Sequence, residues 1–88
     1  MQELSITIKN KLGLHARPAA MLVQTAGRFK AKIKIIKEDQ EVDGKSIMGI
    51  MTLAAGFGSQ LSFIVDGEDE QQAVAALKDL VERGFGEE

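Results

Sequence analysis

The chain keeps its only histidine, His15, close to its only proline, with Arg17 between them in the segment GLHARPAA at residues 13–20. An imidazole is a nucleophile near neutral pH, and a guanidinium binds oxyanions through a bidentate fork. Together these two side chains could accept a phosphoryl group and then stabilise it. The elements around the segment must therefore place the imidazole and the guanidinium side by side.

The residues that follow His15 predict a helix over 16–27, ARPAAMLVQTAG, which is rich in alanine and ends on Gly27 as a C-cap. Pro18 fits the first turn, where the amides have no intrahelical acceptor. His15 would then lie at or beside the N-cap. The free amides of this turn, that of Ala16 included, and the Arg17 guanidinium could hold phosphate. The same positive surroundings favour the neutral, nucleophilic imidazole.

The outer side of this helix predicts a docking surface. On a helical wheel, Arg17, Met21 and Gln24 share one side, and Ala20 flanks them. Met21 is therefore expected to be exposed among polar residues. An exposed methionine beside an arginine is typical of a surface that binds partners.

A second apolar run, IMGIMTL at residues 47–53, predicts a short helix with Ser46 as its N-cap. Its large apolar side chains cover an arc of roughly 220°, which is wider than the ~100° stripe of a single core contact. Some of them must face outward, and a phosphate on Ser46 would add ~1.5 to 2 negative charges beside them. The large apolar residues of this run are Ile47, Met48, Ile50, Met51 and Leu53.

Period-two alternation predicts strands over 4–9, 31–37 and 60–66, with the lysines of 31–37 on the solvated face. A short strand at 41–43 would pair with 31–37 through a turn at 38–40. A third helix is predicted over 70–83 with Asp69 as N-cap, and the C-terminal GFGEE is expected to fray.

The order β-α-β-β-α-β-α predicts an α+β fold, a two-layer open-faced β-sandwich. In it, a mostly antiparallel four-stranded sheet would be covered on one face by three helices.

Composition narrows the classes of function. The chain has 88 residues with 44% hydrophobic and 27% charged residues, which predicts one globular domain spanning 1–88. With no cysteine and one histidine, a metal site is not expected. No apolar run suits a membrane helix and the N-terminus lacks a signal pattern, so we expect a cytoplasmic protein without membrane insertion.

Charge is distributed unevenly along the chain. Residues 1–37 hold eight Lys or Arg against one acid, and residues 38–88 hold three against twelve. The basic part has no Tyr or Trp to stack on bases, so we interpret its lysines as a solvated strand face and expect no nucleic-acid partner.

The motif GLHARPAA, followed about thirty residues later by GKSIMGIM, resembles the HPr phosphocarrier family of the bacterial phosphoenolpyruvate-dependent sugar phosphotransferase system, over essentially the whole chain. The resemblance implies an open-faced β-sandwich and a phosphoryl group received from enzyme I on Nδ1 of His15. The group would pass to the A-domain of a sugar-specific enzyme II. By position, Arg17 is the electrostatic partner of His15. The partner-contact positions are Ala20, Met21, Gln24, Ile47, Met48 and Met51.

Ser46 falls where many relatives are phosphorylated by HPr kinase/phosphorylase, and the flanking KSIMGIM resembles the version that this kinase recognises. The resemblance thus implies regulation at Ser46. In Gram-positive relatives the serine-phosphorylated form also binds a catabolite-control transcription factor. No cofactor motif is present in the sequence, and we expect a monomeric carrier, not an enzyme, that binds its partners transiently.

Two other functions compete with the carrier. In the first, the chain is a Ser46-regulated binding module in carbon catabolite control, in which His15 is incidental and no sugar permease is served. In the second it is a small hydrolase, but no nucleophile, base and orienting acid are visible around the single histidine.

Overall fold

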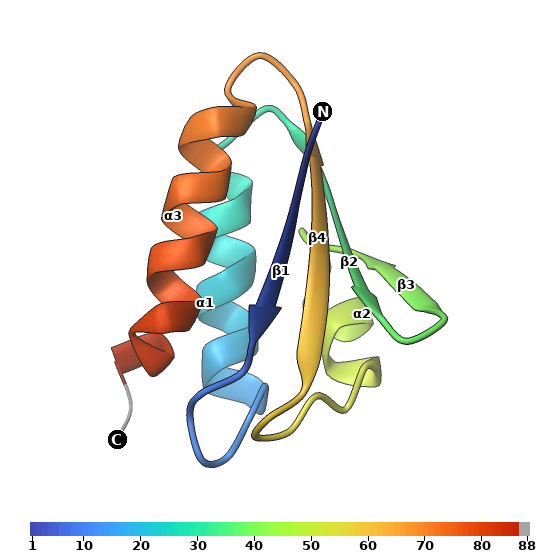
Figure 1. Ribbon diagram of the computed structural model, residues 1–88, viewed down its shortest axis with the longest axis vertical. Helices are drawn as coiled ribbons and strands as arrows, with labels where there is room; N and C mark the ends of the chain where they lie inside the picture. The colour runs from blue at the N-terminus through green and yellow to red at the C-terminus, as the bar shows by residue number, and fades with distance from the viewer. Residues whose placement is uncertain (87–88) are drawn as a thin grey trace.

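Four strands form one antiparallel sheet in the order β1-β4-β2-β3, and three helices lie against one of its faces (Figure 1). The computed structural model describes residues 1–86. The strands are β1 (Gln2–Thr7), β2 (Lys32–Lys37), β3 (Gln40–Asp43) and β4 (Gln60–Asp66). The helices are α1 (Ala16–Gly27), α2 (Ile47–Thr52) and α3 (Glu70–Glu82), and a 3₁₀ turn follows at Gly84–Gly86. The predicted fold class and element order are confirmed.

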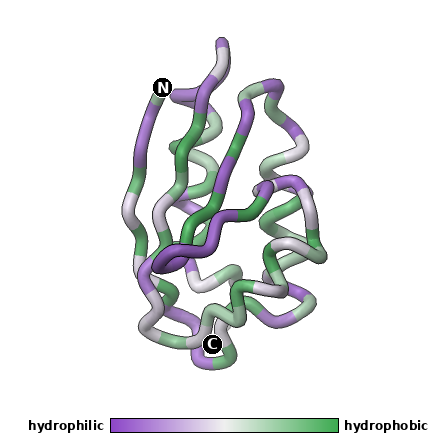
Figure 2. Tube along the Cα trace, turned by 90° about the vertical axis from the view of Figure 1, so that its right-hand side faces the viewer, coloured by the Kyte–Doolittle hydropathy of each residue, from purple (hydrophilic) through white to green (hydrophobic). Residues whose placement is uncertain are grey.

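Alternation along the strands creates the two faces of the sheet. In β4, Leu61, Phe63 and Val65 are buried, and their neighbours are more exposed. Both hydrophobic and hydrophilic residues occur along the strands (Figure 2). The register places Ile35 directly opposite Phe63, so side chains of adjacent strands pack against each other on the buried face. The open face keeps the polar residues in water.

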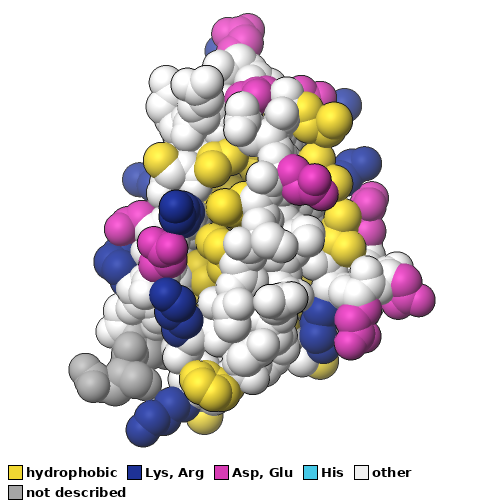
Figure 3. All heavy atoms as spheres, viewed as in Figure 1, with side chains coloured by type: hydrophobic (Ala, Val, Ile, Leu, Met, Phe, Trp, Pro, Cys, Tyr) yellow, Lys and Arg dark blue, Asp and Glu magenta, His cyan; other side chains and the backbone are white. Residues whose placement is uncertain are grey.

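The core lies between this sheet and the helices. Leu22 of α1 and Leu77 of α3 are fully buried, as are Phe63 of β4 and Ile50 of α2. Burying a side chain of this kind contributes about 1.5–3 kcal/mol to folding. Hydrophobic side chains gather between α3 and β1 in the space-filling view, with charged side chains around them (Figure 3). The helices are therefore held on the sheet by their apolar stripes.

Several element boundaries differ from the prediction by one or two residues. β1 begins and ends two residues earlier than 4–9, although Ile8 still exchanges hydrogen bonds with Ser59 and Gly58 (2.8 and 2.9 Å). Gly27 is the last residue of α1 and not its cap, because Arg28 continues in the right-handed helical conformation (φ −75°, ψ −12°).

The prediction that the C-terminal residues fray is wrong for Gly84–Gly86. These residues form the 3₁₀ turn, and Phe85 is buried with a φ of +58°. Burial of the Phe85 ring ties this turn to the core. Residues 87–88 of the predicted frayed segment lie outside the described residues.

The start of α3 lies at the opposite end of the sheet from the loop before α1 (Figure 1). Asp69 has the N-cap position that was predicted, but its side chain does not cap α3. Its carboxylate accepts from the backbone amides of Lys30 and Ala31 (2.9 and 3.0 Å), and these bonds lower the pKa of Asp69. The prediction of a side-chain cap is therefore wrong, because the carboxylate binds the α1–β2 connection instead.

Candidate functional site

A tight turn before α1 places His15. The amide of Gly13 donates to the carbonyl of Asn10 (3.1 Å), and Nδ2 of Asn10 donates back to the Gly13 carbonyl (2.8 Å). Gly13 has a φ of +69°, and a Cβ there would lie 2.4 Å from the carbonyl oxygen of Ala55. Only glycine fits this contact. The Leu14 amide donates to the same Ala55 oxygen (2.8 Å), which ties the turn to the segment after α2.

His15 immediately precedes α1, as predicted. Its backbone is extended (φ −78°, ψ −171°), and its side chain makes no capping hydrogen bond. The first intrahelical bond runs from the Ala19 amide to the His15 carbonyl (3.0 Å). The amides of Ala16 and Arg17 precede that bond, and Pro18 has no amide hydrogen to satisfy. The helix start thus offers two amides beside a half-buried imidazole, an arrangement that suits an anion.

Arg17 adds positive charge at the same helix start. Its side chain is exposed, and the first turn of α1 contains no acidic residue. None of the ion pairs within residues 1–86 involves it. The guanidinium can therefore turn toward phosphate oxygens, and charge-assisted hydrogen bonds of this kind are among the strongest in proteins.

The residues predicted to contact partners lie on α1 and α2, two helices that pack against each other. On α2 the exposed fractions are 74% for Met48, 44% for Met51 and 38% for Ile47. The expectation that part of this apolar helix faces outward is confirmed. We call the six residues that are predicted to contact partners the docking face: Ala20, Met21, Gln24, Ile47, Met48 and Met51.

Met21 differs from its prediction. It is half-buried and packs against the core, because α3 lies beside this part of α1. A hollow of about 280 Å³ lies between α1 and α3. It is lined by Met21 and Gln24 of α1, by Leu80 of α3, and by Arg28 and Arg83, which directly follow the two helices. The prediction that Met21 is exposed is therefore wrong, because a helical wheel of α1 alone does not include the neighbouring helix α3.

Two exposed apolar residues near His15 were missed by the sequence analysis. Leu12 is 74% exposed and Phe57 is 68% exposed. They lie next to Gly13 and Gly56, whose backbones touch, since a Cβ on Gly13 would meet the Gly56 Cα at 2.6 Å. The sequence feature that could have identified them is a single large apolar residue next to a glycine, in KLG at 11–13 and in GFG at 56–58. These two exposed apolar side chains therefore belong to adjoining loops, one of which leads directly to His15.

Ser46 caps α2, as predicted. Its Oγ accepts from the Gly49 amide (3.1 Å), and its own amide donates to the Asp43 carbonyl (3.1 Å). Ser46 is half-buried and directly precedes the exposed residues Ile47 and Met48. A charge added at this oxygen would therefore lie at the edge of the docking face.

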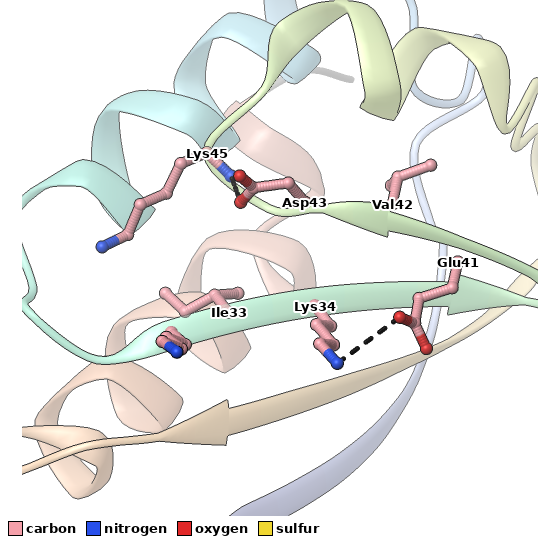
Figure 4. A pocket seen from close by; sticks show the side chains of 7 residues that line it. Ile33, Lys34, Glu41, Val42, Asp43 and Lys45 are labelled. Atoms are coloured by element: carbon pink, nitrogen blue, oxygen red, sulfur yellow. Dashed lines mark hydrogen bonds and ion pairs between the residues drawn. The ribbon is translucent and has the colours of Figure 1, made fainter.

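A hollow of about 420 Å³ lies where β2 and β3 separate, next to Ser46 (Figure 4). Ile33 and Val42 give it an apolar lining, and Lys34 pairs with Glu41 across it (3.5 Å). The side chain of Lys45 points away from the hollow, and its Nζ donates to the carbonyl of Phe29 in the α1–β2 loop (2.8 Å).

Within residues 1–86, no group of three or more His, Cys, Asp or Glu side chains is arranged so that it could hold a metal ion.

The fold and the site define a small α+β protein that presents a histidine at the start of one helix and exposed apolar side chains on another. Residues 2–83 match the family described as the PTS HPr component phosphorylation site. The phosphocarrier protein HPr of Cupriavidus necator is 51% identical over 87 residues, which cover 99% of this chain and 98% of the relative.

Solved structures agree with these matches. HPr-C-His from Thermoanaerobacter tengcongensis has a TM-score of 0.96 at 51% identity, over 100% of this chain and 99% of that chain. Crh of Bacillus subtilis, a catabolite repression protein reported as a domain-swapped dimer, has a TM-score of 0.76 at 41% identity, over 94% of this chain and 95% of that chain. The chain belongs to the HPr phosphocarrier family of the phosphotransferase system.

Proposed function

We propose that this chain carries phosphoryl groups from phospho-enzyme I to the A-domain of a sugar-specific enzyme II. In the first step, a ring nitrogen of neutral His15 attacks the phosphorus. A nitrogen–phosphorus bond forms while the bond between phosphorus and the donor atom breaks, and that electron pair stays with the donor. In the second step an acceptor on enzyme II attacks the same phosphorus, and the electron pair returns to His15.

The observation that carries this proposal is the position of His15 directly before α1. The amides of Ala16 and Arg17 have no intrahelical acceptor, and the exposed Arg17 guanidinium is on the same turn. Phosphate oxygens on His15 could accept from both amides and from the guanidinium. This cradle stabilises the phosphorylated form, yet the nitrogen–phosphorus bond stays reactive enough to pass the group on.

The docking face supports a carrier that binds several partners in turn. Met48 and Met51 are flexible side chains that adapt to surfaces of different shape. No helix within residues 1–86 is long and apolar enough to cross a membrane. We propose that the carrier acts as a monomer in the cytoplasm and binds each partner transiently through this face.

A relay assay tests the proposed transfer. The chain is incubated with enzyme I, magnesium and labelled phosphoenolpyruvate, and an enzyme II A-domain is then added. We expect the label to appear on the chain and then to move to the A-domain, and we expect His15→Ala to receive none. Label that reaches the A-domain equally well with His15→Ala would refute the assignment.

We also propose that Ser46 is a regulatory site for HPr kinase/phosphorylase, which could join the chain to a catabolite-control transcription factor. The support is the place of Ser46 at the edge of the docking face. Incubation with the kinase and ATP should add one phosphate to the intact mass of the wild type and none to Ser46→Ala. A Ser46→Ala protein that still gains a phosphate would exclude this serine.

A purely regulatory binding module is the second candidate function. The observation in its favour is the similarity to Crh, a catabolite repression protein. This function predicts that partner binding is unchanged in His15→Ala and depends on Ser46. Titration calorimetry of His15→Ala and Ser46→Ala against the same partner separates the two functions.

A further inference from the structure

Lys37 lies on the face of the sheet where a lysine is not expected. Side chains alternate between the two faces of a strand, so Lys37 is on the same face as the buried Ile33 and Ile35, and its Nζ reaches the segment after α2. Ile36 is on the open face, beside Ser5 and Ser62. The predicted place of Lys37 among the solvated lysines is wrong. An ammonium group at a half-buried position destabilises the fold unless it finds acceptors.

The acceptors are the carbonyl groups that follow the last turn of α2. Nζ of Lys37 donates to the carbonyl of Leu53 (3.1 Å) and lies 3.5 Å from that of Ala54. Gln40 is opposite Lys37 in the β2–β3 register, and its Nε2 donates to the carbonyl of Thr52 (3.3 Å). Two side chains at the end of one hairpin thus bind three consecutive carbonyls. We call these contacts the hairpin clamp.

Helix α2 is short and buries only one of its own side chains completely. It has six residues, and isolated helices shorter than about 12 residues are marginal in water. Ile50 is the buried residue of α2, since Met48 and Met51 face solvent. The last carbonyls of a helix lack intrahelical donors, and a cation near them is favoured by the helix dipole. The clamp supplies both a donor and a cation at this point.

The same segment continues to the turn that holds His15. The next carbonyl in the chain, that of Ala55, accepts from the Leu14 amide (2.8 Å). Gly13 packs directly on the Ala55 oxygen. One short stretch of backbone therefore contacts Lys37 on one side and the loop before α1 on the other.

We propose that Lys37 is a positioning residue for phosphoryl transfer. By fixing the carbonyl end of α2, its ammonium group holds Met48 and Met51 in one orientation and braces the turn before His15. The claim that Lys37 assists transfer rests on the proposed function. The claim that Lys37 keeps α2 ordered is independent of that function.

The first test is amide hydrogen exchange of Lys37→Met, which removes the charge and keeps the length. We expect the amides of Ile50, Leu53 and Ala54 to exchange at least about tenfold faster than in the wild type. The matched control is Lys34→Met on the same strand, which breaks only the exposed pair with Glu41. Its α2 amides should exchange as in the wild type. If Lys37→Met does not fold, Lys37→Gln is measured in its place.

The second test is the kinetics of phosphoryl transfer from phospho-enzyme I. We expect Lys37→Met to raise KM about five- to tenfold with kcat within about twofold, since docking is weakened more than chemistry. Val81→Ala is the control for general destabilisation, because Val81 is buried in α3 and α3 does not carry the docking face. It should leave KM unchanged.

If the amides of Ile50, Leu53 and Ala54 exchange equally fast in Lys37→Met and Lys34→Met, the hairpin clamp is refuted. If they exchange faster in Lys37→Met but its KM is unchanged, the role of the clamp in transfer is refuted. A wild type that accepts no phosphoryl group would refute the proposed function instead, and the exchange comparison would still decide the clamp.

Discussion

The starts of α1 and α2 each carry a side chain that could receive a phosphate, but the two side chains relate differently to their helices. Ser46 gives its oxygen to the Gly49 amide and so closes the start of α2. His15 makes no such capping bond, and the amides after it remain for another acceptor. The start of α2 is completed by the protein itself, whereas the start of α1 can be completed by a ligand.

Under the proposed function, this difference separates phosphoryl transfer at His15 from regulation at Ser46. A group that arrives on His15 finds donors already in place and can leave again without disturbing α1. A phosphate on Ser46 would occupy the oxygen that caps α2 and would put charge beside Ile47 and Met48. We therefore expect changes at His15 to affect chemistry and changes at Ser46 to affect docking and the stability of α2.

The largest effect is expected from Gly13→Ala, which should break the His15 side of this comparison. A positive φ and a Cβ at 2.4 Å from the Ala55 oxygen should lower the free energy of unfolding by at least about 2 kcal/mol. Urea denaturation measures it. Gly27→Ala is the control, since nothing lies within 4 Å of its Cβ position. Equal stability of the two variants would contradict the account of the turn.

Arg17→Gln should lower kcat/KM for phosphoryl transfer by about 10- to 100-fold, because one charged donor is lost from the cradle. Its unfolding free energy should change by less than about 0.5 kcal/mol, as Arg17 is exposed. Arg28→Gln, just beyond the other end of α1, is the charge-matched control and should transfer normally. A comparable loss in both variants would show that net charge, and not the cradle, matters.

Ser46→Ala sharpens the α2 side of the comparison. Loss of the cap should lower the free energy of unfolding by about 1 kcal/mol and leave transfer to His15 almost unchanged. Ser46→Asp keeps an acceptor for the Gly49 amide, so it should be more stable than Ser46→Ala while raising KM several-fold. Chemical denaturation and transfer kinetics measure both. A Ser46→Ala protein as stable as the wild type would mean that the cap is unimportant.

Asp69→Asn extends the comparison to the start of α3, with the smallest expected effect. The pKa of Asp69 is lowered by bonds from the Lys30 and Ala31 amides, so its carboxylate stabilises the fold above the unfolded pKa. That stabilisation is lost as the pH falls through the folded pKa. Urea midpoints should differ between Asp69→Asn and wild type at pH 7 and converge in strong acid. A difference that persists in acid would exclude this carboxylate as the cause.

Periodicity and local chemistry predicted much of this molecule. The bounds of α1 and β4 follow from short-range sequence patterns. The place of His15 before a helix follows in the same way, because the effects of proline and alanine on helix formation extend over only one or two turns. Ser46 as a cap follows in the same way. These features depend on neighbours that are close in sequence.

Features that depend on distant neighbours could not be predicted. Met21 is half-buried because α3 lies beside it, and Asp69 binds amides 38 and 39 positions away. Lys37 resembles any strand lysine until α2 is placed above it. In each case the partner that decides the environment belongs to another element, which local patterns do not locate.

The central claim is that His15 itself carries the phosphoryl group, and the stability of the bound phosphate tests it most directly. The wild type and His15→Ala are each incubated with active enzyme I, magnesium and phosphoenolpyruvate, and the bound phosphate is then exposed to acid and to alkali. The account predicts an acid-labile, alkali-stable phosphate on the wild type and none on His15→Ala. An acid-stable phosphate, or no phosphate on the wild type beside a known carrier that is labelled, would contradict it.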